Sequence, residues 1–253
     1  MTLNTEKTSD LIGAVASLKD KLSLQLSFPA ILSIVQRFPC PARAKEELVS
    51  PIRTVVDPLY SVRHRFLQKW LVDALELRLK EEGYRVRMVA EARSPFGTGD
   101  LDIRVTGTTV EVVTDKVLIR EEVKGGNFEY DQLVRYLFDC DHVVVTLGAR
   151  GTAFKLSRED VGNLVGPLEA LYVKKMDILS KDGDLDRIPG RDWCRGCTVA
   201  CPHATTEYKH TLDIQKEIVG PSDQWASAIA EAVTLTLALL GRTRETCVEV
   251  TAQ

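Results

Sequence analysis

The sequence lacks the features that mark a secreted or membrane-spanning chain. Residues 1–10 are polar and contain no apolar segment of the kind found in signal peptides. The longest apolar stretch, residues 229–240, is interrupted by Glu231 and is too short to cross a bilayer as a helix. We therefore expect a cytoplasmic protein without a membrane partner.

An excess of positive charge is also absent. The formal net charge is −3, so the composition by itself does not indicate nucleic-acid binding. No G-x-x-x-x-G-K-[S/T] loop is present, which argues against a P-loop nucleotide-hydrolysing domain. Basic residues nevertheless gather in the first third of the chain, at Arg37, Arg43, Lys45, Arg53, Arg63, Arg65 and Lys69. A local basic patch is therefore compatible with the acidic total.

Cysteine is present in a pattern that favours metal binding. In a reducing compartment, six cysteines indicate a metal or cluster site rather than disulfides. Three of them form Cys194-x-x-Cys197-x-x-x-Cys201-Pro, a spacing typical of iron–sulfur ligands. The fourth ligand is either Cys40, which lies between two prolines, or His203, which would complete a Cys₃His zinc site.

Two strand-like stretches carry the residues of a candidate active site. Asp102 lies in residues 101–105, where apolar and polar residues alternate. Glu122 and Lys124 are two apart near the end of residues 117–123, so both side chains leave one face of a strand. Carboxylates from neighbouring strands form a hard oxygen site for Mg²⁺ or Mn²⁺, and a lysine beside them stabilises charge on a phosphate.

Two helical stretches add three further candidates. Gln132 and Tyr136 are four residues apart in the predicted helix 128–138, so one side chain lies above the other. His64 lies in the predicted helix 57–82, which we expect to end at Gly83. Taken alone, His64 is an ordinary surface or satisfied histidine.

The same periodicities predict the rest of the fold. Alternation and buried apolar runs predict strands over residues 84–92, 101–105, 109–113, 117–123 and 142–147. Further helices are expected in residues 1–39, over residues 156–182 with Ser157 as the cap, and over residues 222–240, ending at Gly241. One sheet flanked by helices, an α/β architecture, accounts for this order.

These motifs together resemble a known superfamily. The order Gly99-x-Leu101-Asp102, Glu122-x-Lys124, Gln132-x-x-x-Tyr136 is similar to the RecB-like branch of the PD-(D/E)XK nucleases. One cysteine before this core and three after it resemble the CRISPR-associated RecB-like exonuclease family. The resemblance implies a restriction-endonuclease-like core whose mixed sheet is flanked by helices. It also implies a cysteine-cluster subdomain that joins the N- and C-terminal segments.

The resemblance also implies boundaries and roles. Residues 1–56 would be a helical segment with the first cluster cysteine, residues 57–150 the nuclease core, and residues 151–253 the C-terminal helical and cysteine-cluster segment. The implied catalytic residues are Asp102, Glu122 and Lys124, the metal ligands are His64, Asp102 and Glu122, and the DNA-binding residues are Gln132 and Tyr136. An iron–sulfur cluster, 4Fe–4S by this resemblance with zinc as the alternative, would be held by Cys40, Cys194, Cys197 and Cys201.

The implied activity is metal-dependent hydrolysis of DNA. We expect an exonuclease that uses Mg²⁺ or Mn²⁺ on single strands or DNA ends. The resemblance implies a role in CRISPR spacer acquisition, alongside the integrase complex. Two alternatives stay open. The protein could be a RecB-like DNA repair nuclease with a structural zinc site, or a non-catalytic DNA-binding subunit of a nuclease complex.

Overall fold

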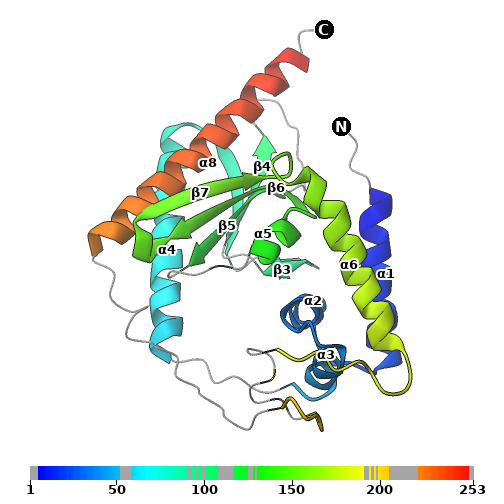
Figure 1. The fold of residues 1–253 in the computed structure, drawn as a ribbon. Coiled ribbons are helices and arrows are strands. Elements are labelled where there is room, and N and C mark those ends of the chain that lie inside the picture. Colours follow the sequence, from blue (N-terminus) through cyan, green and yellow to red (C-terminus); the bar gives the residue numbers. More distant parts are fainter. Residues whose placement is uncertain are drawn as a thin grey trace. The chain divides into compact units, whose positions relative to one another are not determined.

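The computed structural model describes residues 5–51, 58–90, 93–94, 96–98, 101–107, 117–124, 128, 130–190, 194, 197, 199–204 and 222–250. The chain divides into two compact units, whose elements are labelled in Figure 1. Unit 1 comprises Met1–Val55, Ser94–Gly97 and Gly162–Leu212. Unit 2 comprises Val56–Arg93, Thr98–Val161 and Asp213–Gln253. Both units are therefore assembled from segments that lie far apart in the sequence.

Unit 1 is helical in its described part. Its helices are α1 (Thr5–Lys21), α2 (Phe28–Arg37), α3 (Pro41–Val49) and α6 (Gly162–Ser180). Helix α6 packs against the other three, and α2 also contacts α1 and α3. The apolar spacing of the first helix predicts one buried face, and its residues on that face are buried, namely Leu11, Val15 and Leu18.

Unit 2 contains a five-stranded mixed sheet. Its strand order is β1-β4-β5-β6-β7, with bounds Arg85–Ala90, Leu101–Gly107, Val117–Lys124, Cys140–Leu147 and Thr152–Ser157. The pairs β1–β4, β4–β5 and β6–β7 are antiparallel, whereas β5 and β6 are parallel. Two short strands, β2 (Arg93–Ser94) and β3 (Gly97–Thr98), form a separate small sheet.

Helices cover both faces of the large sheet. On one face, α4 (Pro58–Glu81) and α8 (Ser222–Val250) share a core with β-strand residues such as Ile119 and Val123. On the other face lies α5 (Tyr130–Tyr136), which connects β5 to its parallel neighbour β6 (Figure 1). The prediction of an α/β fold with a mixed sheet flanked by helices is confirmed at this level.

The segment after β6 differs from the prediction. Residues 152–157 form the edge strand β7, and the helix expected from residue 156 begins only at Gly162. Ser157 does not cap that helix. Its amide and hydroxyl donate to the Asp160 carboxylate at 2.8 and 2.6 Å, which closes a turn. The prediction was wrong because pairing with β6, a tertiary contact, decides the state of a segment this short.

The last helix is longer than predicted. Gly83 ends α4 with a φ of +75°, as expected, but Gly241 has no positive φ and α8 continues to Val250. By length and composition, Asp223–Gly241 is apolar enough to cross a membrane, a test that core helices of soluble proteins also pass. In this structure 44% of its most apolar window is buried. Trp225 packs so tightly on Gly148 that a Cβ at that glycine would collide with the indole.

Part of the prediction concerns residues outside the described ranges. The strand expected over residues 109–113 is one such element. The expected segments 1–56, 57–150 and 151–253 were defined by function, and the two compact units do not test that division.

Candidate active site

Strand pairing brings the two predicted carboxylate positions onto neighbouring strands. In the register of β4 with β5, Asp102 is opposite Arg120 and Ile103 is opposite Ile119. Glu122 lies two residues further along β5 from Arg120. The backbone of Asp102 is described, whereas its side chain lies outside the described part of the structure.

Glu122 and Lys124 form a close ion pair at the end of β5. The Lys124 Nζ and Glu122 Oε1 atoms are 2.5 Å apart, and the side chains are 21% and 5% exposed. Their separation of two residues puts both on one strand face, as the sequence predicts. A nearly buried carboxylate is expensive to desolvate, so the adjacent ammonium offsets part of that cost.

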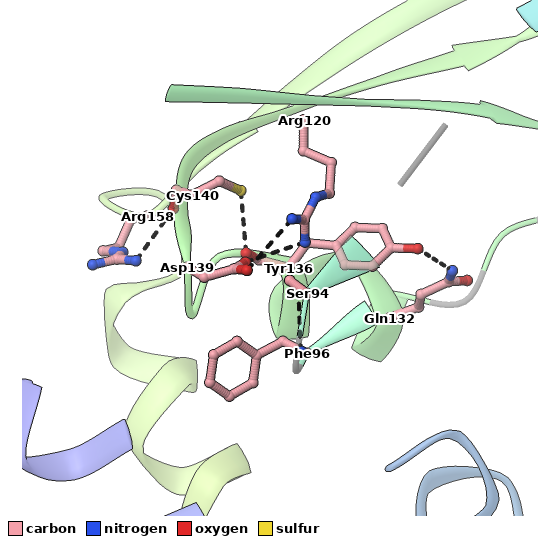
Figure 2. Close-up of polar contacts among 8 residues, drawn as sticks. All are labelled: Ser94, Phe96, Arg120, Gln132, Tyr136, Asp139, Cys140 and Arg158. Carbon is pink, nitrogen blue, oxygen red and sulfur yellow. Dashed lines mark hydrogen bonds and ion pairs between the residues drawn. The ribbon is translucent and has the colours of Figure 1, made fainter. Parts of the chain in front are cut away.

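The Gln132 amide connects this ion pair to helix α5. Its oxygen accepts a hydrogen bond from Lys124 Nζ at 3.4 Å, and its nitrogen donates to Glu122 Oε1 at 3.4 Å. The same nitrogen donates to the Tyr136 hydroxyl at 2.5 Å, a contact that Figure 2 shows. The structure therefore brings Glu122, Lys124, Gln132 and Tyr136 into one group of contacts, which we call the contact group.

Burial keeps the Tyr136 phenol neutral. Burial raises the pKa of this phenol far above its ordinary value, the Glu122 carboxylate raises it further, and the Gln132 hydrogen bond opposes both effects. The Arg120 guanidinium carbon lies 5.0 Å from the centre of the phenol ring. A neutral phenol can accept the amide hydrogen bond without adding negative charge beside Glu122.

Two residues at the site belong to no sequence motif. Arg120 is fully buried, and its ion pair with Asp139 has an Nη1–Oδ1 distance of 3.1 Å. One feature of the sequence could have indicated Arg120. It is a charged residue inside an apolar strand, two positions before Glu122 and therefore on the same face. Its partner could not be identified from periodicity, because Asp139 follows α5 and meets Arg120 only in the folded sheet.

His64, the third predicted metal ligand, is half-buried on α4. Helix α4 packs on the face of the sheet that carries Ile119 and Val123, whereas Glu122 alternates onto the face covered by α5. Among the described side chains, no three His, Cys, Asp or Glu groups converge as a metal site. The ligand set of His64, Asp102 and Glu122 stays a prediction.

The four predicted cluster cysteines all belong to unit 1. Cys40 caps the start of α3 in the extended backbone that its flanking prolines predict, and its side chain is buried. Its thiol contacts the Asp186 carbonyl at 3.9 Å, and the Ala42 amide donates to the same oxygen at 3.4 Å. The chain around Cys40 therefore meets the segment that leads directly to Cys194.

Hydrogen bonds connect the described residues around two of these cysteines. The Cys197 amide donates to the Cys194 carbonyl at 3.3 Å, and the Cys194 sulfur accepts the Gly190 amide at 3.3 Å. Cys194, Cys197 and Cys201 are half-buried and form no disulfide, and His203 is exposed. Thiols are the donor type that a soft metal or a cluster prefers, but no three of these described side chains converge in the structure.

Several residues of the expected basic patch are already engaged within their own units. Arg43 is buried and pairs with Glu47 at 3.0 Å, and Lys69 pairs with Asp73 at 2.6 Å. The Lys45 ammonium donates to a backbone carbonyl at 2.9 Å. The side chains of two other members, Arg53 and Arg63, lie outside the described ranges.

Comparison with known proteins adds no assignment. No family model, curated protein or solved structure matches this chain.

Proposed function

We propose that this protein is a metal-dependent deoxyribonuclease whose active site forms around Glu122 and Lys124. The contact group carries the proposal, because a carboxylate and a lysine at 2.5 Å on one strand are both held by an amide of the following helix. The adjacent strand carries Asp102, so the two carboxylate positions lie on paired strands. This placement is compatible with a two-carboxylate site for a hard cation.

The order of the elements supports the same proposal. Helix α4, the antiparallel strands β1, β4 and β5, helix α5 and the parallel strand β6 follow one another along the chain. This is the helix, meander, helix and strand order that the resemblance to PD-(D/E)XK nucleases implies. Because one fold serves many chemistries, the contact group carries more weight than the topology.

The proposal assigns roles to the metal ligands, to the lysine and to the glutamine of the site. Asp102 and Glu122 would hold Mg²⁺ or Mn²⁺. The third ligand, His64, rests on the resemblance alone, because its helix α4 packs on the sheet face opposite Glu122. Such an ion supplies Lewis-acid activation of a phosphate and lowers the pKa of a bound water. Lys124 is 21% exposed, so it can reach a substrate and stabilise the negative charge that develops on the phosphate oxygens. Gln132 orients both charged side chains.

We extend the proposal to substrate and pathway on the resemblance alone. The substrate would be single-stranded DNA or DNA ends, processed as an exonuclease during CRISPR spacer acquisition with the integrase complex. Cys40, Cys194, Cys197 and Cys201 would hold a structural 4Fe–4S cluster, or zinc in its place. The contact of Cys40 with Asp186 brings it to the segment before Cys194, although no three of the described cysteines converge in the structure.

Cleavage of end-labelled DNA tests the proposed function. The purified protein is incubated with single-stranded and blunt duplex DNA in Mg²⁺, in Mn²⁺ or in chelator. We expect products only with a divalent cation, and a loss of at least about 100-fold for Lys124→Ala or Asp102→Ala. Lys80→Ala removes an exposed lysine from a surface ion pair and should cleave like the wild type.

Circular dichroism and thermal unfolding establish whether each variant folds. Cleavage by Lys124→Ala at the wild-type rate would contradict the assigned site. Binding of DNA by a folded wild-type protein, without cleavage in any metal, would contradict the enzymatic proposal and favour a DNA-binding subunit.

A further inference from the structure

A buried ion pair adjoins the contact group. Arg120 is fully buried in β5, and its two terminal nitrogens face the Asp139 carboxylate at 3.1 Å (Nη1–Oδ1) and 3.4 Å (Nη2–Oδ2). Figure 2 shows this two-point contact, with the Tyr136 ring beside the guanidinium. The 5.0 Å between the guanidinium carbon and the ring centre is a cation–π distance. The pair therefore holds the guanidinium in one orientation against the ring.

The Tyr136 ring, held by Arg120, in turn restricts the orientation of Gln132. Tyr136 is fully buried, and its hydroxyl accepts the Gln132 amide at 2.5 Å. The two bonds from Gln132 to Glu122 and Lys124 are both 3.4 Å, close to the limit for a hydrogen bond. The orientation of Gln132 thus depends mainly on Tyr136, which in turn packs on Arg120.

Helix α5, which carries Gln132 and Tyr136, is too short to orient them by itself. It has seven residues, fewer than an isolated helix needs in water. Asp139 follows the end of this helix, so its pairing with Arg120 ties that end to β5. An apolar side chain would fill the position of Arg120 without the cost of burying charge. A buried arginine therefore indicates that this position needs oriented hydrogen bonds and not only side-chain volume.

We propose that Arg120 and Asp139 are positioning residues of the active site. Together they orient Tyr136, and through it Gln132, toward the charged pair at the end of β5. The catalytic consequence rests on the proposed nuclease function. Arg120 is fully buried and acts through Tyr136, so the pair should affect turnover rather than DNA binding.

A double-mutant cycle tests this role. Asp139→Asn keeps the shape of the side chain and removes its charge. We expect kcat to fall by about tenfold while KM for DNA stays within about twofold. Gln132→Ala should have a similar effect, and adding Asp139→Asn to it should cost little more, because both changes act through one contact. Losses that multiply would overturn the proposal.

Two further variants keep the kinetic test interpretable. Lys80→Met removes one member of the exposed pair with Glu76, whose atoms are 2.6 Å apart, and should leave kcat unchanged. If Asp139→Asn does not fold, Arg120→Lys takes its place. It keeps the charge but loses the two-point contact, so the same loss in kcat is expected.

Fluorine NMR reads the position of Tyr136 without a nuclease assay. In protein labelled with 3-fluorotyrosine, Tyr136→Phe identifies the resonance of this ring. We expect Asp139→Asn to move that resonance toward the free amino acid and to leave the other tyrosines in place. An unmoved Tyr136 resonance would overturn the proposal.

The two readouts separate this inference from the proposed function. A wild type without nuclease activity, whose Tyr136 resonance still moves in Asp139→Asn, would refute the function and retain the orienting role of the pair. A wild type that cleaves DNA, with kcat and resonance both unaffected by Asp139→Asn, would refute the positioning role alone.

Discussion

At the scale of single residues, the phenol of Tyr136 combines burial with a charged neighbour. Burial and the nearby Glu122 carboxylate both raise its pKa, so the phenol keeps its proton to a pH above that at which a free phenol ionises. The protonated phenol accepts the Gln132 amide and packs against the Arg120 guanidinium without a net charge of its own. This state has a consequence for stability at high pH.

We predict that Tyr136 makes the protein lose stability as the pH rises above about 10. In the unfolded chain the phenol ionises near its ordinary pKa of 10.0, whereas in the folded protein it keeps its proton to a higher pH. The folded state then binds more protons than the unfolded state, so the unfolding free energy falls as pH rises. Urea unfolding of the wild type and Tyr136→Phe at about pH 8 and about pH 11 measures this loss.

The variant should lose less stability over this interval than the wild type. Tyr130→Phe changes a ring that is 52% exposed and serves as the matched control. Equal pH dependence of the wild type and Tyr136→Phe would contradict a raised pKa at this position.

At the scale of elements, β5 presents different chemistry on its two faces. The side chains of Arg120, Glu122 and Lys124 share the face that α5 covers, whereas Glu121 lies on the other face and contacts α8. Glu121 is fully buried, and its Oε1 accepts a hydrogen bond from the Thr236 hydroxyl at 2.5 Å. This bond helps to fix α8 on the face opposite the contact group.

Thr236→Val should therefore lower the unfolding free energy by about 1–3 kcal/mol, because it removes a hydroxyl donor from a buried carboxylate while keeping the volume of the side chain. Urea unfolding monitored by circular dichroism measures the change. Thr234→Val is the matched control, since that exposed hydroxyl donates within its own helix, to the Ala230 carbonyl at 2.9 Å. We expect the control to stay within about 0.5 kcal/mol. Similar losses in both variants would mean that the Glu121 contact contributes little.

At the scale of the whole molecule, each compact unit draws on distant parts of the chain. Cys40 and Asp186 are 146 residues apart in sequence and in contact within unit 1. If Cys40 is a ligand, its loss should remove the metal as completely as the loss of a cysteine in the C-terminal stretch.

We expect Cys40→Ser and Cys197→Ser to purify without the metal that the wild type carries. Anaerobic purification, iron, sulfide and zinc analysis and a visible spectrum give the measurement, with a broad band at about 400 nm expected for a cluster. Cys140→Ala is the control, because this buried thiol lies in unit 2 and donates to the Tyr136 carbonyl at 3.1 Å. Its metal content should match that of the wild type.

The outcomes distinguish the two metals. Iron and sulfide in the wild type support the cluster, whereas zinc alone supports a zinc site. Full metal in Cys40→Ser would exclude Cys40 and make His203 the next ligand to test.

Local periodicity in the sequence was enough to locate most of the elements around the site. Alternation and, for β6, a buried apolar run identified β1, β4, β5 and β6, and Gly83 was correctly expected to end α4. The two-residue spacing of Glu122 and Lys124, and the four-residue spacing of Gln132 and Tyr136, put each pair on one face. These relations follow from the repeat of a strand or a helix, so no knowledge of the partner element is needed.

Other features were decided only by the tertiary structure. Pairing with β6 made residues 152–157 a strand. The approach of Gln132 to the β5 ion pair, and the pairing of Arg120 with Asp139, depend on how a helix crosses a strand. Such contacts join residues that no local period relates, because burial and hydrogen bonding between elements select them during folding.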